Sequence, residues 1–172
     1  MKRRHTFPAL VFVILAGIVA STHSSSAVVT EQGPSAFGQG DFSFFSGLGT
    51  EHWGYSFDAT ANHRGQARGR ATFNILENFV QTQVVVKINC LEVVGSSGFA
   101  TAFLSGTVLH SDDPEFPKHA NVVFLAEDNS NSPTFHPDII SRLFVFEGID
   151  CHDRAVPLTF FQQSPDAITI EP

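Results

Sequence analysis

The chain has 172 residues, of which 42% are hydrophobic, and its 17 acidic and 10 basic residues give a formal net charge of −7. This length fits a single domain with one buried core. An acidic chain whose densest basic cluster is Arg64, Arg68 and Arg70 is poorly suited to bind nucleic acid or anionic lipid, so we predict neither partner.

Residues 1–27 have the three parts of a signal peptide. Basic residues at 2–4 form a positive amino-terminal region, an apolar run covers 7–20, and small residues at 25–27 resemble a cleavage site. The run is shorter than the about 20 apolar residues of a membrane-spanning helix, and a retained anchor is the alternative. We therefore expect a secreted or periplasmic protein with no membrane span after processing and a net charge of −10 over the remaining 145 residues.

Residues 28–48 are rich in Ser, Gly and Gln, which predicts a flexible leader. Four phenylalanines within nine residues stand out in it: Phe37, Phe42, Phe44 and Phe45. They could form an edge strand that docks on the domain, or an exposed apolar patch that awaits a partner. Docking is favoured, because large exposed apolar patches are uncommon on monomeric proteins.

A single β-domain is predicted over 49–172. It begins with two segments in which apolar and polar residues alternate, 52–59 and 70–75, as in half-buried strands. One face of the first segment carries the aromatic residues Trp53, Tyr55 and Phe57. Such residues could line a ligand cavity, but at strand spacing they more often belong to an ordinary core.

The segment 82–94 is predicted to be a long central strand. Its inward face is formed by Val84, Val86 and Ile88. The phase of the alternation slips after Cys90, which indicates a β-bulge at that residue. Glycines at both ends of 95–98 then favour a tight hairpin that leads into a partner strand over 99–109.

The rest of the pattern predicts strands over 121–127 and 139–146, followed by a closing hairpin from 158–161 and 167–170. The residues after the signal peptide contain no segment of convincing helical period. We therefore predict an all-β fold, an antiparallel meander of seven to eight strands that forms a closed barrel or a two-sheet sandwich.

The two cysteines, Cys90 and Cys151, are predicted to form a structural disulfide, because an exported chain enters an oxidising compartment. The chain-entropy model gives about 4 kcal/mol for a loop of this length. A free Cys151 thiol beside His152 could instead act as a nucleophile, and a redox or metal role is a further alternative. The chain has no C-x-x-C motif, which favours the structural role.

Two loops carry the strongest candidates for chemistry, because they gather the carboxylates and imidazoles that bind Ca²⁺ or a transition metal. The candidate ligands are His110, Asp112, Asp113 and His119 in the first loop, and Asp128, His136 and Asp138 in the second. Neither loop has the spacing of an EF-hand or an H-E-x-x-H site. Asp and Asn are also common turn residues, so the turn interpretation is favoured.

Several short motifs occur in a fixed order over 53–152: INCLEVVGSSGFATAFLSGTV from Ile88, VVFLAEDN from Val122, PDIIS from Pro137, and IDC ending at Cys151. This order resembles a pattern in small exported bacterial proteins of uncharacterised function. The pattern comprises a Cys-Leu-x-Val strand, a glycine turn, a Glu-Asp-Asn turn and a second cysteine. The resemblance implies a compact β-domain with a Cys90–Cys151 bridge, and it carries over no catalytic residue.

The chain contains no nucleophile elbow and no dinucleotide-binding loop, and we assign no catalytic residue and no cofactor. The favoured function is a non-enzymatic binding or structural module with a protein or small-molecule ligand. The alternative is a metal-dependent hydrolase or a Ca²⁺-binding protein that uses the two acidic and histidine-containing loops.

Overall fold

The computed structural model describes residues 33–47, 49–131, 136–154, 159–164 and 166–172, so the predicted signal peptide lies outside the described residues. The described part is all-β, as predicted, and it has ten strands instead of seven to eight. The strands are β1 (Ser35–Phe45), β2 (Thr50–Ala61), β3 (Ala67–Glu77), β4 (Val80–Ser96), β5 (Phe99–Ser111), β6 (Asn121–Asp128), β7 (Ile139–Ser141), β8 (Phe144–Val145), β9 (Phe160–Gln162) and β10 (Ile168–Glu171). These residues hold no helix of the length and apolarity needed to cross a membrane.

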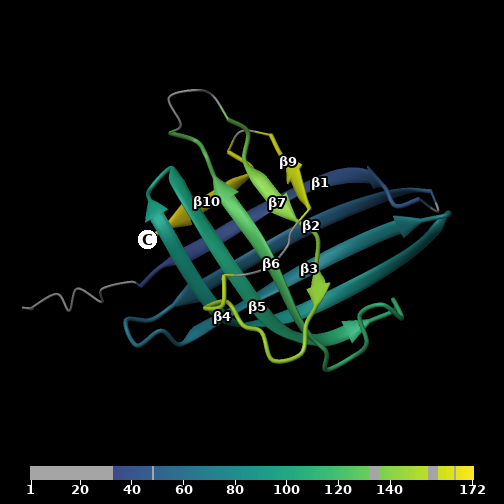
Figure 1. The fold of residues 1–172 in the computed structure, drawn as a ribbon, viewed down its shortest axis with the longest axis horizontal. Helices are drawn as coiled ribbons and strands as arrows, with labels where there is room; N and C mark the ends of the chain where they lie inside the picture. Colours follow the sequence, from purple (N-terminus) through teal and green to yellow (C-terminus); the bar gives the residue numbers. More distant parts are fainter. Residues whose placement is uncertain (1–32, 48, 132–135, 155–158, 165) are drawn as a thin grey trace, which may run out of the picture. The chain divides into compact units, whose positions relative to one another are not determined.

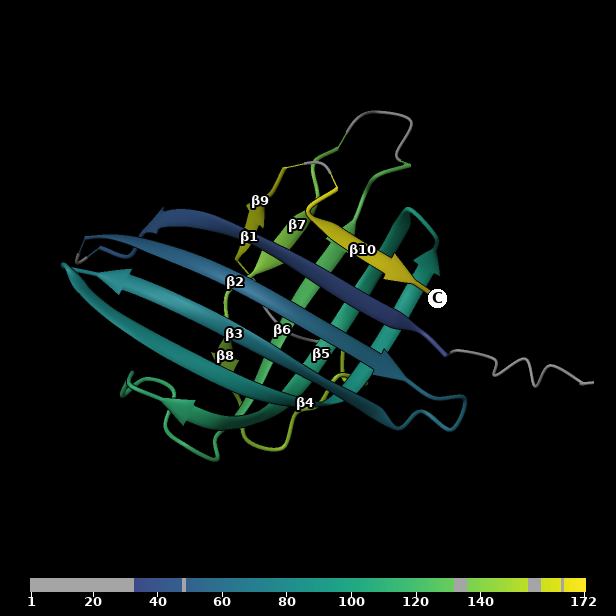
Figure 2. The same cartoon turned by 180° about the vertical axis from the view of Figure 1, so that it is seen from behind.

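All ten strands belong to one antiparallel sheet that curls into a half-barrel (Figures 1 and 2). Neighbouring strands follow the order β10-β1-β2-β3-β4-β5-β6-β7-β9, and β8 pairs with β6 beyond the end of β7. The strands from β1 to β6 form a meander, because each pairs with the next along the chain. The sheet is therefore not divided into the two sheets of a sandwich.

The carboxy-terminal strands differ from the prediction in two ways. The predicted strand 139–146 is interrupted, because the Ser141 hydroxyl accepts the hydrogen bond of the Leu125 amide at 2.8 Å and so replaces a backbone carbonyl of the ladder. The predicted closing hairpin has both strands, but they do not pair with each other. Instead, β9 pairs with β7, and β10 pairs with β1 on the far side of the sheet.

The predicted leader needs the largest correction, because Ser35–Phe45 is the strand β1. It pairs with β2 along its whole length and with β10 over residues 35–38, so this segment is a strand docked on the domain, as favoured for its phenylalanines, and not a flexible leader. Ala36 and Phe42 are buried in the core, and Phe42 stacks on Phe161 at 4.2 Å between ring centroids. This part of the range 28–48 is a component of the sheet.

The predicted bulge in the long central strand is confirmed. The register between β4 and β5 shifts between Ile88 and Cys90, and a second shift lies between Val85 and Val86. The predicted inward residues Val84, Val86 and Ile88 are fully buried. Beyond the bulge the inward position passes to Leu91, which is also buried. The extra residue turns the Cys90 side chain toward the outer face of the sheet, where it meets Cys151.

The half-barrel is filled by aromatic side chains. Trp53, Tyr55 and Phe57 are all at most 4% exposed and belong to the hydrophobic core. The Trp53 ring meets those of Phe73 and Phe116 edge-on at about 6 Å. The polar atoms of two of these rings are satisfied, since Trp53 Nε1 donates to Glu51 and the Tyr55 hydroxyl donates to Gln163.

Candidate functional site

The two candidate metal-binding loops lie at opposite ends of β6, because one precedes this strand and the other follows it. In the first loop, Asp113 accepts hydrogen bonds from the Thr82 hydroxyl and from the Glu115 amide. His110 Nε2 lies 3.3 Å from Asp112, and both side chains are exposed. His119 has a positive φ of 72° at the end of the loop. Among the described residues, no three of the predicted ligands converge on one point.

In the second loop, two of the predicted ligands hold the sheet together. Asp128 and Asp138 are 2% and 0% exposed. Their carboxylates accept hydrogen bonds from successive inward residues of β10: the Ile170 amide donates to Asp128 at 3.1 Å and the Ile168 amide donates to Asp138 at 3.0 Å. These carboxylates therefore join the free edge of β10 to the end of β6, where no backbone ladder exists.

The remaining oxygens of both carboxylates are also occupied. Asp138 accepts from the Asn129 amide at 2.9 Å, and Asp128 accepts from the amide and hydroxyl of Ser130. Burial raises the pKa of Asp138 despite these hydrogen bonds, and the nearby Asp128 charge raises it further. His136 is exposed and has no part in this network. The pair acts as a structural clasp with few lone pairs free for a metal ion.

Arg142 is a residue that the sequence pattern did not single out. Its guanidinium lies over the rings of Phe44, Trp53 and Phe144, at 5.4 to 5.7 Å from their centroids. It also pairs with Glu115 at 2.8 Å, and burial raises the pKa of that carboxyl while Arg142 lowers it. This residue fastens the loop after β5 to the aromatic core.

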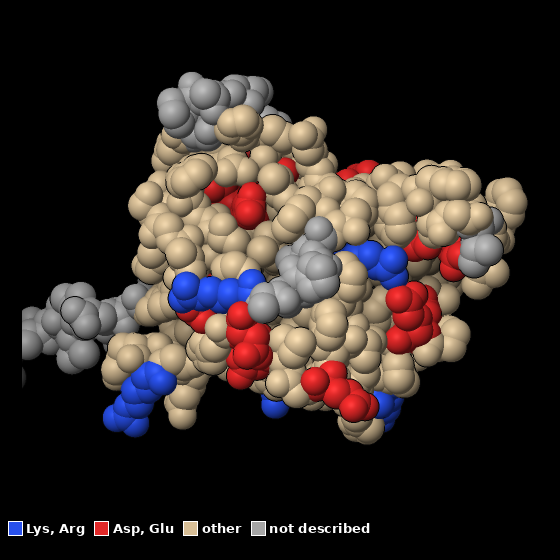
Figure 3. All heavy atoms as spheres, in the orientation of Figure 1, with Lys and Arg blue, Asp and Glu red and all other residues tan. Residues whose placement is uncertain are grey.

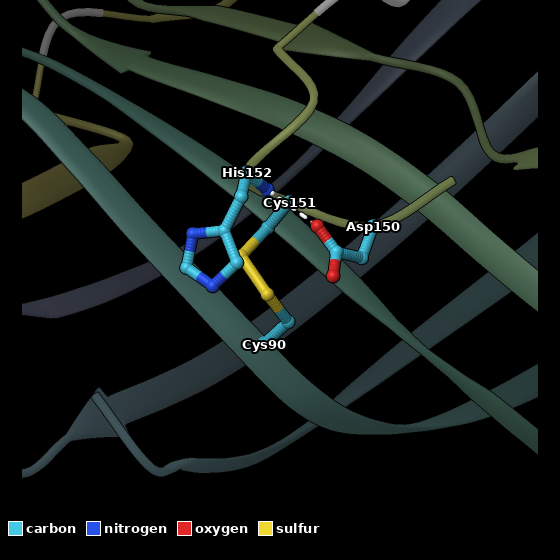
Figure 4. Close-up of side chains that lie close together, drawn as sticks. All are labelled: Cys90, Asp150, Cys151 and His152. Carbon is cyan, nitrogen blue, oxygen red and sulfur yellow. Dashed lines mark hydrogen bonds between the residues drawn. A yellow bond between two sulfur atoms is a disulfide. The ribbon is translucent and has the colours of Figure 1, made fainter. Parts of the chain in front are cut away.

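A disulfide joins Cys90 and Cys151, as predicted, and it pins the segment 149–152 to the outer face of the sheet (Figure 4). The pinned segment forms one wall of a polar cleft of about 370 Å³, whose lining includes Asn89, Ser105, Asn121, Asp150 and His152. Beside the cleft, His152 Nδ1 lies 2.8 Å from Glu92, which also pairs with Arg154. The lining of this cleft is mainly polar.

A second hollow, of about 500 Å³, lies over the outer face of β1, β2 and β3. Its lining includes Phe37, Gln39, Asp58, Arg70 and Asp166. The hollow combines one exposed aromatic ring with side chains of both charges. It is shallow, and it contains no nucleophile with an adjacent base.

The strongest departure from an ordinary surface is an apolar tip at one end of the sheet, where the β1–β2 and β3–β4 hairpins turn. The apolar tip consists of Phe45, Leu76, Phe79 and Val80, which are 75%, 40%, 100% and 62% exposed. The two turns touch, since a Cβ on Gly49 would lie 3.0 Å from Asn78 Oδ1. Figures 1 and 2 show these hairpins reaching beyond the other strands.

Two acidic residues lie just behind the apolar tip. Glu51 of β2 and Glu77 of β3 face each other across the sheet just behind it. The basic residues Arg64, Arg68 and Arg70 lie at the opposite end of β3. On the face drawn in Figure 3, the right-hand end that carries these hairpins is tan and red. The sequence offered one signal of the tip, an Asn78-Phe79 pair between two strands, where Asn-Gly is the usual choice.

Comparison with protein-family models, with curated proteins and with solved structures finds no match for this chain. Its function has to be inferred from the geometry alone.

Proposed function

We propose that this chain is an exported, non-enzymatic binding module that attaches reversibly to a lipid surface through its apolar tip. The observation that carries the proposal is the conformation and exposure of Phe79. Asn78 and Phe79 have φ values of 47° and 67° and form a two-residue turn between β3 and β4. Such turns favour glycine at the second position, and an aromatic residue there costs about 1 to 2 kcal/mol.

The Phe79 side chain makes no buried contact that offsets this conformational free energy, because it is fully exposed. Hydrophobic residues that strain the backbone and face solvent mark a surface used for something other than folding. Phe45 lies 75% exposed at the adjacent turn and enlarges the same surface. The two rings project from hairpin ends, a shape that suits insertion between lipid chains.

The area of the apolar tip distinguishes a lipid surface from a protein partner. With about 200 Å² for a whole phenylalanine side chain, the two rings expose about 350 Å². A standard protein interface buries about 800 Å² on each partner, so the two rings alone are too small for one. Burial of 350 Å² in hydrocarbon is worth about 9 kcal/mol before the costs of association. This is close to the gross value for a single myristoyl chain, which gives marginal, reversible attachment.

The charges behind the apolar tip define the class of lipid. Glu51 and Glu77 lie behind it, and the whole chain carries a net charge of −7, so an anionic surface repels it. We therefore propose a zwitterionic surface as the target. The Cys90–Cys151 disulfide supports exposure to an oxidising compartment, in keeping with the predicted signal peptide. The alternative of a metal-dependent enzyme loses two candidate ligands, since Asp128 and Asp138 already bind backbone amides.

Co-sedimentation with phosphatidylcholine vesicles tests the proposal. We expect an association constant on the order of 10³ to 10⁴ M⁻¹, so that about half of the protein pellets at lipid concentrations of about 0.1 to 1 mM. Phe79→Gly should weaken this at least fivefold, because it removes the more exposed ring without straining the turn. Phe99→Ser is the matched control, since Phe99 is 60% exposed but lies at the opposite end of β4.

Two results would contradict the proposal. One is no partition at lipid concentrations of several millimolar. The other is binding that requires anionic lipid or that Phe79→Gly leaves unchanged.

A further inference from the structure

The side chains around the disulfide form a group with the composition of a metal site. One ligand atom from each of Cys90, Asp150, Cys151 and His152 lies within 4.8 Å of all the others. Figure 4 shows the imidazole and the carboxylate on either side of the two sulfurs. In the oxidised protein the sulfurs are bonded to each other and cannot bind a metal ion as thiolates.

We propose that reduction of this disulfide converts the group into a zinc site. Two thiolates, one imidazole and one carboxylate are four ligands of the kinds that Zn²⁺ binds, and four is the number of its tetrahedral sites. The sulfurs need only move apart to the spacing of two ligands on one ion. Asp150 and His152 stand on either side of Cys151 in the segment that the disulfide pins to the sheet.

An independent observation supports a metal-binding role for His152. Its Nδ1 donates to the Glu92 carboxylate at 2.8 Å, which leaves Nε2 as the ring nitrogen with a free lone pair. Zinc-bound histidines have this arrangement, in which a carboxylate fixes the tautomer and increases the basicity of the ligand. Asp150 is oriented as well, because its Oδ1 accepts from the His152 amide.

Cys90 is the more accessible of the two bridged cysteines. Cys90 lines the polar cleft, whereas Cys151 is 2% exposed and does not. A dithiol of the thioredoxin class would therefore attack Cys90 Sγ and form a mixed disulfide, while the S–S electron pair leaves with Cys151 as a thiolate. The second thiol of the reductant then displaces Cys90. Two electrons and two protons pass to the protein, the reductant becomes a disulfide, and Zn²⁺ replaces the two protons on sulfur.

Zinc titration of the full chain tests this proposal. The protein is reduced with a phosphine, desalted without oxygen, and titrated with Zn²⁺ against a chromogenic chelator. We expect one zinc ion per reduced chain and none per oxidised chain. Cobalt in place of zinc should give the absorption of a tetrahedral site with sulfur-to-metal charge transfer.

Two variants distinguish a folded site from a simple pair of thiols. Glu92→Gln should weaken zinc binding 10- to 100-fold through its effect on His152, and His152→Ala should weaken it further. His110→Ala is the matched control, because His110 also pairs with a carboxylate but lies near the carboxy-terminal end of β5, away from the disulfide. Its zinc affinity should equal that of the wild type.

A reduced chain that has unfolded would hold zinc only through its two thiols. In that case Glu92→Gln would have no effect, and the affinity would match that of the reduced chain in urea. Either result, or the absence of zinc binding by the reduced protein, would overturn the proposal.

Discussion

Substitution of Asp138 by alanine should destabilise the fold, because this carboxylate carries part of the clasp between β10 and the end of β6. The side chain is fully buried, and its two oxygens accept from the amides of Asn129 and Ile168 at 2.9 and 3.0 Å. Alanine leaves both amides without a partner and opens no path for water to replace the carboxylate.

The expected loss can be estimated from these two hydrogen bonds. A buried N–H group left without an acceptor costs about 1 to 3 kcal/mol, so the pair costs about 2 to 6 kcal/mol. The raised pKa of Asp138 shows that its charge is itself unfavourable in the folded state, and removing the charge offsets part of the loss. We therefore expect the free energy of unfolding to fall by about 3 kcal/mol.

Urea denaturation followed by the fluorescence of Trp53 measures this change. With a denaturant dependence of about 2 kcal/mol per molar, the midpoint should fall by about 1.5 M. Asp112→Ala is the control, because Asp112 is 60% exposed and pairs only with an exposed histidine. Its effect should stay within about 0.5 kcal/mol. A midpoint for Asp138→Ala within 0.3 M of wild type would refute the clasp.

Three further predictions concern stability. Replacing both Cys90 and Cys151 with serine should cost about 4 kcal/mol, the chain entropy of a 61-residue loop, and a loss under 1 kcal/mol in urea denaturation would argue against that origin. Phe79→Gly should raise the free energy of unfolding by about 1 kcal/mol while vesicle binding falls, since glycine accepts the φ of 67° without strain; a destabilised variant would show that the ring has a role in folding. Because the pKa of Asp138 is higher in the folded protein than in the unfolded chain, protonation of this carboxyl stabilises the folded state. This stabilisation is complete below the ordinary pKa of 3.8, and it is lost as the pH rises through the raised pKa. Wild type should therefore lose stability relative to Asp138→Asn across that window, and a difference independent of pH would be inconsistent with the shift.

Local patterns were sufficient to predict the central strands and the bulge. Val84, Val86 and Ile88 set the inward face of β4, and the slip after Cys90 was visible in the sequence alone. In contrast, β1 was predicted as a leader, because glycines at 38 and 40 weaken its alternation. These glycines are required by close packing, since a Cβ on Gly38 would lie 2.8 Å from the Phe57 ring.

The candidate sites were less predictable, because they depend on partners far apart in the sequence. Asp128 and Asp138 were predicted as turn residues or metal ligands. Neither role predicts that their carboxylates accept hydrogen bonds from backbone amides of β10, which lie 30 to 42 residues later in the chain. Likewise, the pairing of His152 with Glu92 spans 60 residues and depends on the disulfide. Phe79 was not singled out, because hydrophobic residues are not expected in a two-residue turn.

The depth of the apolar tip in a bilayer is the measurement that tests the proposed attachment most directly. A tryptophan introduced by Phe79→Trp, with the wild-type emission of the buried Trp53 subtracted, should shift to shorter wavelength on phosphatidylcholine vesicles. Lipids brominated along their acyl chains should quench it, while a tryptophan introduced by Phe99→Trp, at the other end of β4, should show neither effect. Emission from position 79 that stays at the wavelength of an exposed tryptophan and is not quenched would contradict the proposed attachment.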